Sequence, residues 1–368
     1  MLISHIHIVN YKNYEDVHVD FHPQFNVITG YNGEGKTNLI DAIHYLGLTR
    51  SYFLSTDTHN YRHESDFFRL DGLFVQDETE HRIVCKTQKR KPKVFEKDAK
   101  KYERLVDHIG LIPIVMIAPK DGNIINEGSV ERRRIIDTTI SQLDSDYLEC
   151  LMEYNYILKQ RNQLLKSDEE HRIDLSLLDV YDQKLSITGS TIFDKRKAYL
   201  EELKDIFLDK YEFISGGKEI SDLTYKSKLS ETALDVLLKE NRKKDLILQR
   251  TSVGVHKDDL VFLNNGSPIK FIGSQGQQKS FVLALKLAQF ELIKKHRQVS
   301  PIILLDDIFD KLDSSRVMHL IKLLNNAKLG QIFITDTEKD RLNHIFEELN
   351  FDFALYEVAD NQVLPVTL

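Results

Sequence analysis

The eight residues from Gly30 to Thr37 have the composition and spacing of a phosphate-binding loop. Their order matches the pattern GxxxxGK followed by Ser or Thr at every fixed position. Glycines let backbone N–H groups approach phosphate oxygens closely, Lys36 supplies positive charge at the β- and γ-phosphates, and Thr37 supplies a hydroxyl ligand for Mg²⁺. The alternative is a glycine-rich turn that contains a lysine by chance. We therefore expect ATP and Mg²⁺ as cofactors, with ATP bound by Gly30, Tyr31, Asn32, Gly33, Glu34, Gly35, Lys36, Thr37 and Asn38.

A second group of candidate residues follows the apolar run Ile-Ile-Leu-Leu. Two carboxylates, Asp306 and Asp307, follow this run directly, as at the end of a buried parallel strand that faces a ligand crevice. In this pattern, called Walker B, Asp306 would hold Mg²⁺ and Asp307 would polarise the attacking water. We therefore expect Asp307 and Lys36 to be catalytic. Alone, the pattern also fits an ordinary strand end, and the phosphate-binding loop in the same chain favours the nucleotide site.

A long insertion separates these two motifs, and a third motif lies near its end. The residues Ser-Gln-Gly-Gln-Gln from Ser274 open a stretch with helical spacing of apolar residues. A serine hydroxyl, a closely approaching glycine and a helix N-terminus form a second phosphate cradle, normally offered to the γ-phosphate bound by another copy. This pattern resembles the signature of ABC-type ATPases and assigns Ser274, Gly276 and Gln277 to the site in trans. The alternative is a polar helix-capping loop.

Two further segments occupy the positions where ABC proteins have a D-loop and a switch residue. Asp310-Lys311-Leu312-Asp313 follows Walker B, where the D-loop lies at the dimer seam. Thr335-Asp336-Thr337 ends the next predicted strand, where many of these proteins have a switch histidine. No histidine is present at this position, so the switch role would fall to the hydroxyl of Thr335 or Thr337.

The elements that must hold these motifs follow from the periodicity of apolar residues. Strands are expected at 4–10, 16–21, 25–28, within 69–85, and at 260–263, 302–305 and 332–335, with a helix at 38–48. The first two strands flank a turn at 11–14 and should form a β-hairpin. Residues 136–158 predict one amphipathic helix, and 178–206 predict a second that folds back after a polar break.

These elements predict an α/β fold with a split arrangement. We expect an ABC/SMC-type P-loop ATPase head whose nucleotide fold is interrupted by an inserted α-helical lobe. The head would comprise residues 1–129 and 251–368, and the lobe would comprise residues 130–250.

The composition is that of a soluble globular chain. Hydrophobic residues make up 41% and charged residues 29%, and no run approaches the roughly 18 apolar residues of a membrane span. The first residues alternate apolar and polar side chains, as a strand does, so we expect a cytoplasmic protein without a membrane partner. Cys85 and Cys150 lack metal-site or CxxC spacing, and we expect reduced thiols in place of a disulfide or a structural zinc site.

The net charge of −7 does not indicate a globally basic surface for nucleic acid. Any DNA contact must therefore be local. The densest basic segment is suited to phosphate contacts and contains Lys89, Arg90, Lys91 and Lys93. A solvated charged ribbon is an equal alternative for this segment. A second basic run, Arg132 to Arg134, would alternatively pair with acidic neighbours.

Several motifs occur in a characteristic order along the chain. They are the hairpin, Gly35-Lys36-Thr37-Asn38, Ala118-Pro119-Lys120-Asp121, Glu131-Arg132-Arg133-Arg134, Gly254-Val255-His256-Lys257-Asp258-Asp259-Leu260, SQGQQ and LLDDIFDKLD. In this order the chain resembles the RecF family along nearly its whole length. Val255 stands where the family usually has proline, and Gln275 stands where transport ATPases have glycine.

The resemblance implies an SMC-like ATPase without a long coiled coil. Such a protein forms a dimer when ATP is bound, hydrolyses ATP slowly with stimulation by DNA, and binds DNA near junctions between single and double strands. The resemblance also implies that it works with RecO and RecR to load RecA at single-strand gaps, in recombinational repair and replication-fork maintenance.

Two other functions fit parts of this pattern. A non-hydrolysing DNA scaffold stabilised by ATP would keep the same residues. A nucleotide-binding subunit of a membrane transporter would have a shorter chain, a glycine-rich signature and a switch histidine, and this sequence has none of these features.

Overall fold

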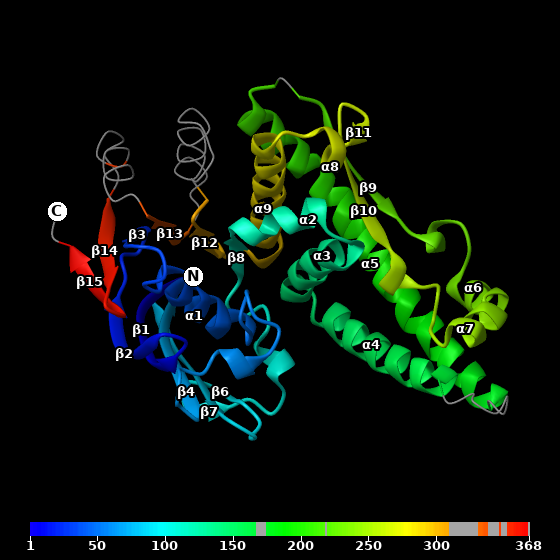
Figure 1. Ribbon diagram of the computed structural model, residues 1–368, viewed down its shortest axis with the longest axis horizontal. Coiled ribbons are helices and arrows are strands. Elements are labelled where there is room, and N and C mark those ends of the chain that lie inside the picture. Colours follow the sequence, from blue (N-terminus) through cyan, green and yellow to red (C-terminus); the bar gives the residue numbers. More distant parts are fainter. Residues whose placement is uncertain (167–173, 218, 309–329, 338–345, 347–351, 367–368) are drawn as a thin grey trace. The chain divides into compact units, whose positions relative to one another are not determined.

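The structure is a computed structural model that describes residues 1–166, 174–217, 219–308, 330–337, 346 and 352–366. It divides into two compact units, one formed by Met1–Asp121 with Leu283–Leu368 and the other by Gly122–Val282 (Figure 1). The first unit takes its residues from both ends of the chain, and the second is one continuous insertion. The expected interruption of an α/β head by an inserted segment is therefore confirmed.

A six-stranded antiparallel sheet forms one part of the first unit, in the order β2-β1-β4-β5-β6-β7. Its strands are β1 (Leu2–Tyr11), β2 (Tyr14–Asp20), β4 (Phe67–Gln76), β5 (Thr79–Gln88), β6 (Val94–Lys97) and β7 (Lys100–Lys101). Residues of alternating burial along β1 and β2 put Ile6, Ile8, Val17 and Val19 in the core and leave polar residues on the outer face. The predicted hairpin is confirmed, with its turn at residues 12–13.

A second six-stranded sheet, in the order β15-β14-β3-β13-β12-β8, carries the predicted nucleotide motifs. Its strands are β3 (Phe25–Thr29), β8 (Ile114–Ile117), β12 (Ile302–Asp306), β13 (Ile332–Asp336), β14 (Phe353–Ala359) and β15 (Gln362–Val366). Every pair is parallel except β14 with β15. β3, β12 and β13 are buried along their whole length, which explains their unbroken apolar runs. Because parallel strands end at the same edge, the residues that follow these three strands lie close together.

Helix α1 (Lys36–Leu48) packs between the two sheets of this unit. Its apolar residues Leu39, Ile43 and Leu46 are fully buried and share one core with Ile8 of β1 and Leu304 of β12. The helix that begins at the phosphate-binding loop is thus fixed on both sides by packed apolar side chains.

The second unit is mainly helical, with a three-stranded sheet in the order β11-β10-β9. Its elements are α2 (Asn123–Asn126), α3 (Ser129–Leu143), α4 (Ser145–Lys166), α5 (Leu175–Ser215), β9 (Ser221–Lys226), α6 (Leu234–Glu240), α7 (Arg242–Leu248), β10 (Asp259–Asn264), β11 (Ser267–Pro268), α8 (Ile269–Ile272) and the start of α9 (Gln275–Arg297). α4 and α5 pack against each other, as the predicted helical hairpin requires (Figure 1). Among the described residues, no helix has the length and apolar character that a membrane crossing needs.

The single helix that we predicted over residues 136–158 is wrong. α3 ends at Leu143 and α4 begins at Ser145, because Asp144 between them has an extended backbone with φ −138° and ψ 107°. The Asp144 carboxylate accepts a hydrogen bond of 2.9 Å from the Tyr147 N–H, so it caps α4. Apolar residues continue with helical spacing across this break, and periodicity alone could not reveal it.

The compact units also begin and end at other residues than we expected. Residues 251–282, which we assigned to the head, belong to the helical unit, and the first boundary follows Asp121. The antiparallel pairing of β10 with β9 and the ion pair of 2.7 Å between Arg132 and Asp259 tie this segment to the insertion.

Candidate nucleotide-binding site

The loop between β3 and α1 has a backbone conformation that favours glycine. Gly30, Gly33 and Gly35 have φ angles of 144°, 91° and 119°. A Cβ on Gly30 would lie 2.4 Å from the Val358 carbonyl oxygen, and a Cβ on Gly35 would lie 2.4 Å from Asn13 Nδ2. The loop leads into the N-terminus of α1, where backbone N–H groups and the helix dipole favour an anion.

Lys36 is the first residue of α1, and its side chain folds over the loop. Its Nζ donates hydrogen bonds to the carbonyl oxygens of Gly30 at 2.7 Å and Tyr31 at 2.9 Å. Burial lowers the pKa of Lys36, whereas the nearby carboxylates, Asp307 foremost, act in the opposite direction. The ammonium group is therefore held at the mouth of the loop among acidic side chains.

Thr37 and Thr335 both bind the same carboxylate oxygen of Asp306. The hydroxyl groups of the two threonines donate to Asp306 Oδ1 at 2.9 Å each. Burial raises the pKa of Asp306, although these two hydrogen bonds and the charge of Lys36 oppose the rise. Asp306 thus lies at the point where the loop, β12 and β13 meet.

Asp307 follows β12 in a left-handed conformation with φ 45°, which is uncommon for a residue other than glycine. Its backbone N–H donates to Thr335 Oγ1 at 2.9 Å. Thr335 therefore fixes the positions of both acidic residues of the Walker B pattern.

A depression at this edge of the sheet brings together the loop, the Walker B pair and one of the two candidate switch residues. It is lined by Asn32, Gly33, Gly35, Lys36, Thr37, Asn38, Asp306, Asp307 and Thr335. Tyr31 is 85% exposed, and Glu34 accepts a hydrogen bond from the Asp360 N–H at 2.9 Å. Thr337 is exposed and does not line the depression. Residues 310–313, the predicted D-loop, lie outside the described residues.

Ser274 of the predicted signature caps helix α9. Its Oγ accepts a hydrogen bond from the Gln277 N–H at 3.2 Å, and its own N–H donates to Gln277 Oε1 at 2.8 Å. This reciprocal pair is a capping box. The capping alternative that the sequence left open is therefore present. It does not exclude a phosphate contact, because a serine hydroxyl has a proton as well as acceptor lone pairs.

The basic segment divides into two parts in the structure. Lys89, Arg90 and Lys91 are exposed at the turn between β5 and β6, where Lys89 pairs with the exposed Asp66 at 3.0 Å. Lys93 instead points inward, where its Nζ donates to the Thr49 carbonyl at 2.7 Å and pairs with Asp57 at 3.0 Å. Lys93 therefore has a structural partner that the sequence did not reveal.

The arginines of the second basic run pair within their own unit. Arg132 binds Asp259 at 2.7 Å, Arg133 donates to the Asp258 carbonyl at 2.5 Å, and Arg134 pairs with Glu131 at 2.7 Å. This arrangement agrees with the alternative in which these arginines bind neighbouring acceptors.

The turn of the first hairpin supports the phosphate-binding loop, and our sequence analysis missed it. Asn13 Nδ2 donates to the Glu34 carbonyl at 2.8 Å, and Asn13 Oδ1 accepts from Asn38 Nδ2 at 2.7 Å. The Tyr14 hydroxyl donates to the Gly35 carbonyl at 2.9 Å. The available signal was a polar turn between two predicted strands, which does not by itself indicate what the turn contacts.

A buried carboxylate joins this turn to α1. Asp41 accepts hydrogen bonds from Lys12 Nζ at 2.6 Å, from the Ser51 hydroxyl at 2.7 Å and from the Tyr11 hydroxyl at 2.8 Å. Burial acts to raise the pKa of Asp41, but Lys12 and the hydrogen bonds outweigh it, and the pKa lies below the usual value. Asp41 is therefore an ionised anchor beneath the loop.

The comparisons with known proteins agree over nearly the whole chain. A family model described as an AAA domain matches residues 5–351. The DNA replication and repair protein RecF of Bacteroides thetaiotaomicron is 44% identical over 359 residues, which cover 97% of each chain. RecF of Flavobacterium johnsoniae is 43% identical over 359 residues, which cover 97% of this chain and 100% of that protein. The chain belongs to the RecF family.

Solved structures show the same relationship at the level of the fold. The structure of the recombination mediator protein RecF with ATP, in the RecFOR pathway, is 28% identical with a TM-score of 0.89, covering 99% of this chain and 97% of that one. An Smc head domain with an extended coiled coil from Pyrococcus furiosus is 17% identical with a TM-score of 0.57, covering 100% of this chain and 96% of that one. The expected ABC/SMC-type α/β head is therefore the fold of this RecF family member.

Proposed function

We propose that this chain binds ATP with Mg²⁺ in the loop between β3 and α1. The observation that carries the proposal is the hydrogen bond of 2.9 Å from Thr37 Oγ1 to Asp306 Oδ1, because P-loop ATPases hold Mg²⁺ with this pair of residue types. Hydroxyl and carboxylate oxygens are hard ligands that suit Mg²⁺. Lys36 would bind the β- and γ-phosphates, and bound Mg²⁺ would neutralise charge on the phosphate oxygens. The relationship to the RecF structure with ATP supports the ATP-binding part of this proposal.

A slow, DNA-stimulated ATP hydrolysis by an ATP-induced dimer follows as the second part of the proposal. Asp307 would polarise the attacking water, and its backbone contact to Thr335 would keep it in position. Ser274, Gly276 and Gln277 would contact the γ-phosphate held by the second copy, while Thr335 would sense that phosphate as the switch residue. Capping of α9 uses acceptor capacity of the Ser274 hydroxyl, so its proton is suited to a phosphate oxygen.

The third part of the proposal concerns DNA repair. The curated relatives are DNA replication and repair proteins, and the related solved structure belongs to the RecFOR pathway. We infer that this chain binds DNA at junctions and single-strand gaps in the cytoplasm and helps RecO and RecR to load RecA. Lys89, Arg90 and Lys91 are exposed together at one turn, which suits them to phosphate contacts. Lys93 is a weaker candidate because Thr49 and Asp57 hold its ammonium group.

The test combines light-scattering mass with ATP turnover on the purified full chain. Mass would be measured without nucleotide, with ADP and with ATP and Mg²⁺, each with and without a gapped DNA duplex. We expect twice the monomer mass only with ATP and Mg²⁺, strengthened by DNA and abolished by Lys36→Met. Asp307→Asn should abolish turnover while its ATP-dependent dimer persists.

Two variants of Ser274 separate capping from the trans contact. Aspartate is a good helix cap but would repel a phosphate, so Ser274→Asp should keep the stability and lose the dimer. Ser274→Ala should lower stability by about 1 kcal/mol through the lost cap. A mass that stays monomeric under every condition would exclude the trans role. Dimers without any turnover in the wild type would favour the ATP-stabilised scaffold.

A further inference from the structure

Several imidazole and carboxylate side chains lie together on the outer face of the first hairpin. Alternation along β1 and β2 puts the apolar residues of both strands in the core. The opposite face carries His5, His7, Asp16, His18 and Asp20. β2 is the edge strand of its sheet, and His18 and Asp20 of this group line a depression together with residues of β14 and β15.

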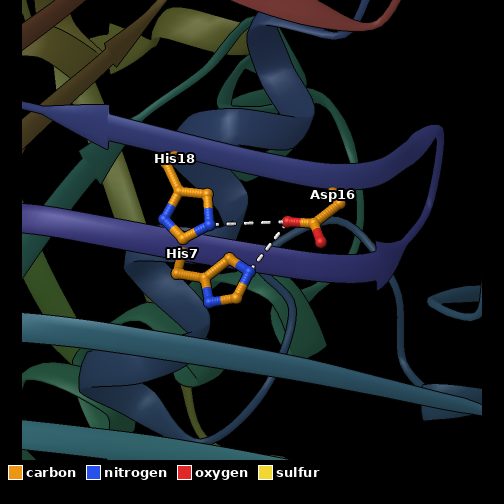
Figure 2. A group of neighbouring side chains, drawn as sticks. All are labelled: His7, Asp16 and His18. Atoms are coloured by element: carbon orange, nitrogen blue, oxygen red, sulfur yellow. Dashed lines mark hydrogen bonds and ion pairs between the residues drawn. The ribbon is translucent and has the colours of Figure 1, made fainter.

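Three of these side chains converge on one point. His7 and His18 are cross-strand partners whose rings stack with centroids 3.8 Å apart and an interplanar angle of 16°. The Nε2 atom of His7 lies 2.8 Å from Asp16 Oδ1, and the Nε2 atom of His18 lies 3.6 Å from the same oxygen. Figure 2 shows both rings directed at this carboxylate. All three potential ligand atoms lie within 4.8 Å of one another.

These separations suit a shared cation. Ligand atoms that bind Zn²⁺ at about 2.0–2.1 Å in a tetrahedron lie roughly 3.4 Å apart. The two distances from Asp16 Oδ1, 2.8 Å and 3.6 Å, fall on either side of this value. The side chains of Asp16 and His18 are 62% and 60% exposed, so they can rotate to bring their ligand atoms to the distances that a bound cation requires.

An ordinary histidine–aspartate pair on the same sheet lacks this convergence. His81 lies 3.0 Å from Asp98 and is 26% exposed, which is close to the 25% exposure of His7. In that pair one imidazole ring contacts one carboxylate, whereas in the hairpin the rings of His7 and His18 both point at Asp16 Oδ1. His81 therefore offers a matched comparison for the hairpin group.

We propose that His7, Asp16 and His18 form a binding site for a borderline divalent cation such as Zn²⁺, Co²⁺ or Ni²⁺. Imidazole nitrogens with one carboxylate are the ligands that these ions prefer, whereas Mg²⁺ and Ca²⁺ prefer oxygen alone. Three protein ligands leave a position for water. Neither cysteine takes part in this site, whose ligands are imidazole and carboxylate groups alone.

A bound cation would join β1 and β2 across the hairpin whose turn supports the phosphate-binding loop. His5 and Asp20, which lie 2.7 Å apart, form a second imidazole–carboxylate pair beside the site, with the His5 ring 5.6 Å from that of His18.

The experiment is a titration of untagged, chelator-treated full chain with Co²⁺, followed by visible absorption, and with Zn²⁺, followed by calorimetry. Excess Mg²⁺ is kept present so that oxygen-only sites are filled. We expect one equivalent of Co²⁺ and of Zn²⁺ to bind to the wild type. His18→Ala and Asp16→Asn should each weaken binding by at least tenfold, and His81→Gln should bind like the wild type.

The choice of variants keeps the test decisive. His18 and Asp16 are exposed, so their substitution should leave circular dichroism and ATP binding unchanged, and a variant that fails this check is replaced by His18→Gln. The proposal is overturned if the wild type binds no Co²⁺ or Zn²⁺, or if the hairpin variants bind as tightly as the wild type. Equal loss in His81→Gln would overturn it as well.

Discussion

Thr335 holds both acidic residues of the proposed site through one hydroxyl group. The hydroxyl donates to Asp306 Oδ1 and accepts from the Asp307 N–H, each at 2.9 Å. The residue is fully buried, so water cannot replace either contact at low cost. At the scale of single residues, the proposed switch residue therefore also fixes the positions of Asp306 and Asp307.

Replacement of Thr335 by valine keeps the shape of the side chain and removes both hydrogen bonds. Because a buried partner left unsatisfied costs about 1–3 kcal/mol, we expect Thr335→Val to lower the free energy of unfolding by that amount. ATP turnover should fall at least tenfold, since Asp307 loses its backbone anchor. Urea denaturation and a phosphate-release assay would measure the two effects. Thr335→Ser keeps the hydroxyl and should retain most of both properties. A valine variant with wild-type turnover would contradict this role.

The sequence predicted the residues of the loop and the Walker B pair because their types and spacing are dictated by phosphate chemistry. It could not distinguish Lys93 from Lys89, because both lie in the same basic run. Each pairs with an aspartate at 3.0 Å, but Lys93 is half-buried against Thr49 and Asp57, whereas Lys89 and its partner Asp66 are exposed. The sequence also provided no reason to prefer Thr335 over Thr337 as the candidate switch residue. Only the register of β13 beside β12 puts Thr335 next to Asp306.

At the scale of elements, the first hairpin and α1 act as one support for the loop. Asn13 of the turn and Tyr14 at the start of β2 donate hydrogen bonds to carbonyl groups of the loop, and Lys12 of the turn binds the buried Asp41 of α1. A strand–loop–helix motif alone would leave the carbonyl groups of the loop to water. The hairpin therefore reduces the conformational freedom that ATP binding would otherwise have to remove.

Asn13→Ala should weaken ATP binding while leaving the fold intact. The variant loses the hydrogen bonds to the Glu34 carbonyl and from Asn38, and two such bonds correspond to roughly tenfold or more in affinity. A fluorescent ATP analogue titrated against both proteins would measure the change. Asn361→Gly is the matched control, because Asn361 contacts Asn13 but is not bonded to the loop, and its φ of 59° suits glycine. Equal affinity for Asn13→Ala and wild type would show that the loop needs no such support.

Most elements could be predicted from apolar periodicity, and the failures have physical causes. β12 and β13 have unbroken apolar runs because both faces of their sheet are covered, and the sequence located them well. β8 and β14 belong to the same sheet but were not predicted. β8 has only four residues, and Glu357 interrupts the apolar residues of β14, so neither gives as clear a signal as β12 or β13. The break at Asp144 depends on one backbone conformation and one capping contact, neither of which alters the apolar spacing.

At the scale of the whole molecule, buried histidines couple the fold to pH. Burial lowers the pKa of His44, His108 and His256 to about 4 each. His108 Nε2 lies 2.7 Å from the Leu46 carbonyl oxygen, so this nitrogen carries the proton of a neutral ring. These histidines occur in both compact units, so acid should affect each of them.

We expect the protein to lose stability as the pH falls from 6.5 toward 4. In this range the unfolded histidines take up protons and the folded ones do not, so their contribution is complete above pH 6.5 and decreases below it. Each fully buried histidine adds a slope of up to about 1.4 kcal/mol per pH unit. Urea denaturation at several pH values would measure the slope of the free energy of unfolding against pH. His108→Gln keeps an N–H donor and should show a smaller slope. A flat profile between pH 6.5 and 5 would contradict the prediction.

The split of the first unit has a consequence for how the protein is made. In its mainly parallel sheet, β3 precedes the inserted unit in the chain but lies between β13 and β14, which are synthesised after that unit. The inserted unit, Gly122–Val282, is continuous and can fold as soon as it has been synthesised. The apolar face of α1 and both sides of β3 must wait for the final part of the chain, and closing so long a loop slows folding. The apolar surfaces of α1 and β3 therefore stay exposed to aggregation and to chaperones until the segment after the insertion has been made, although they are synthesised before it.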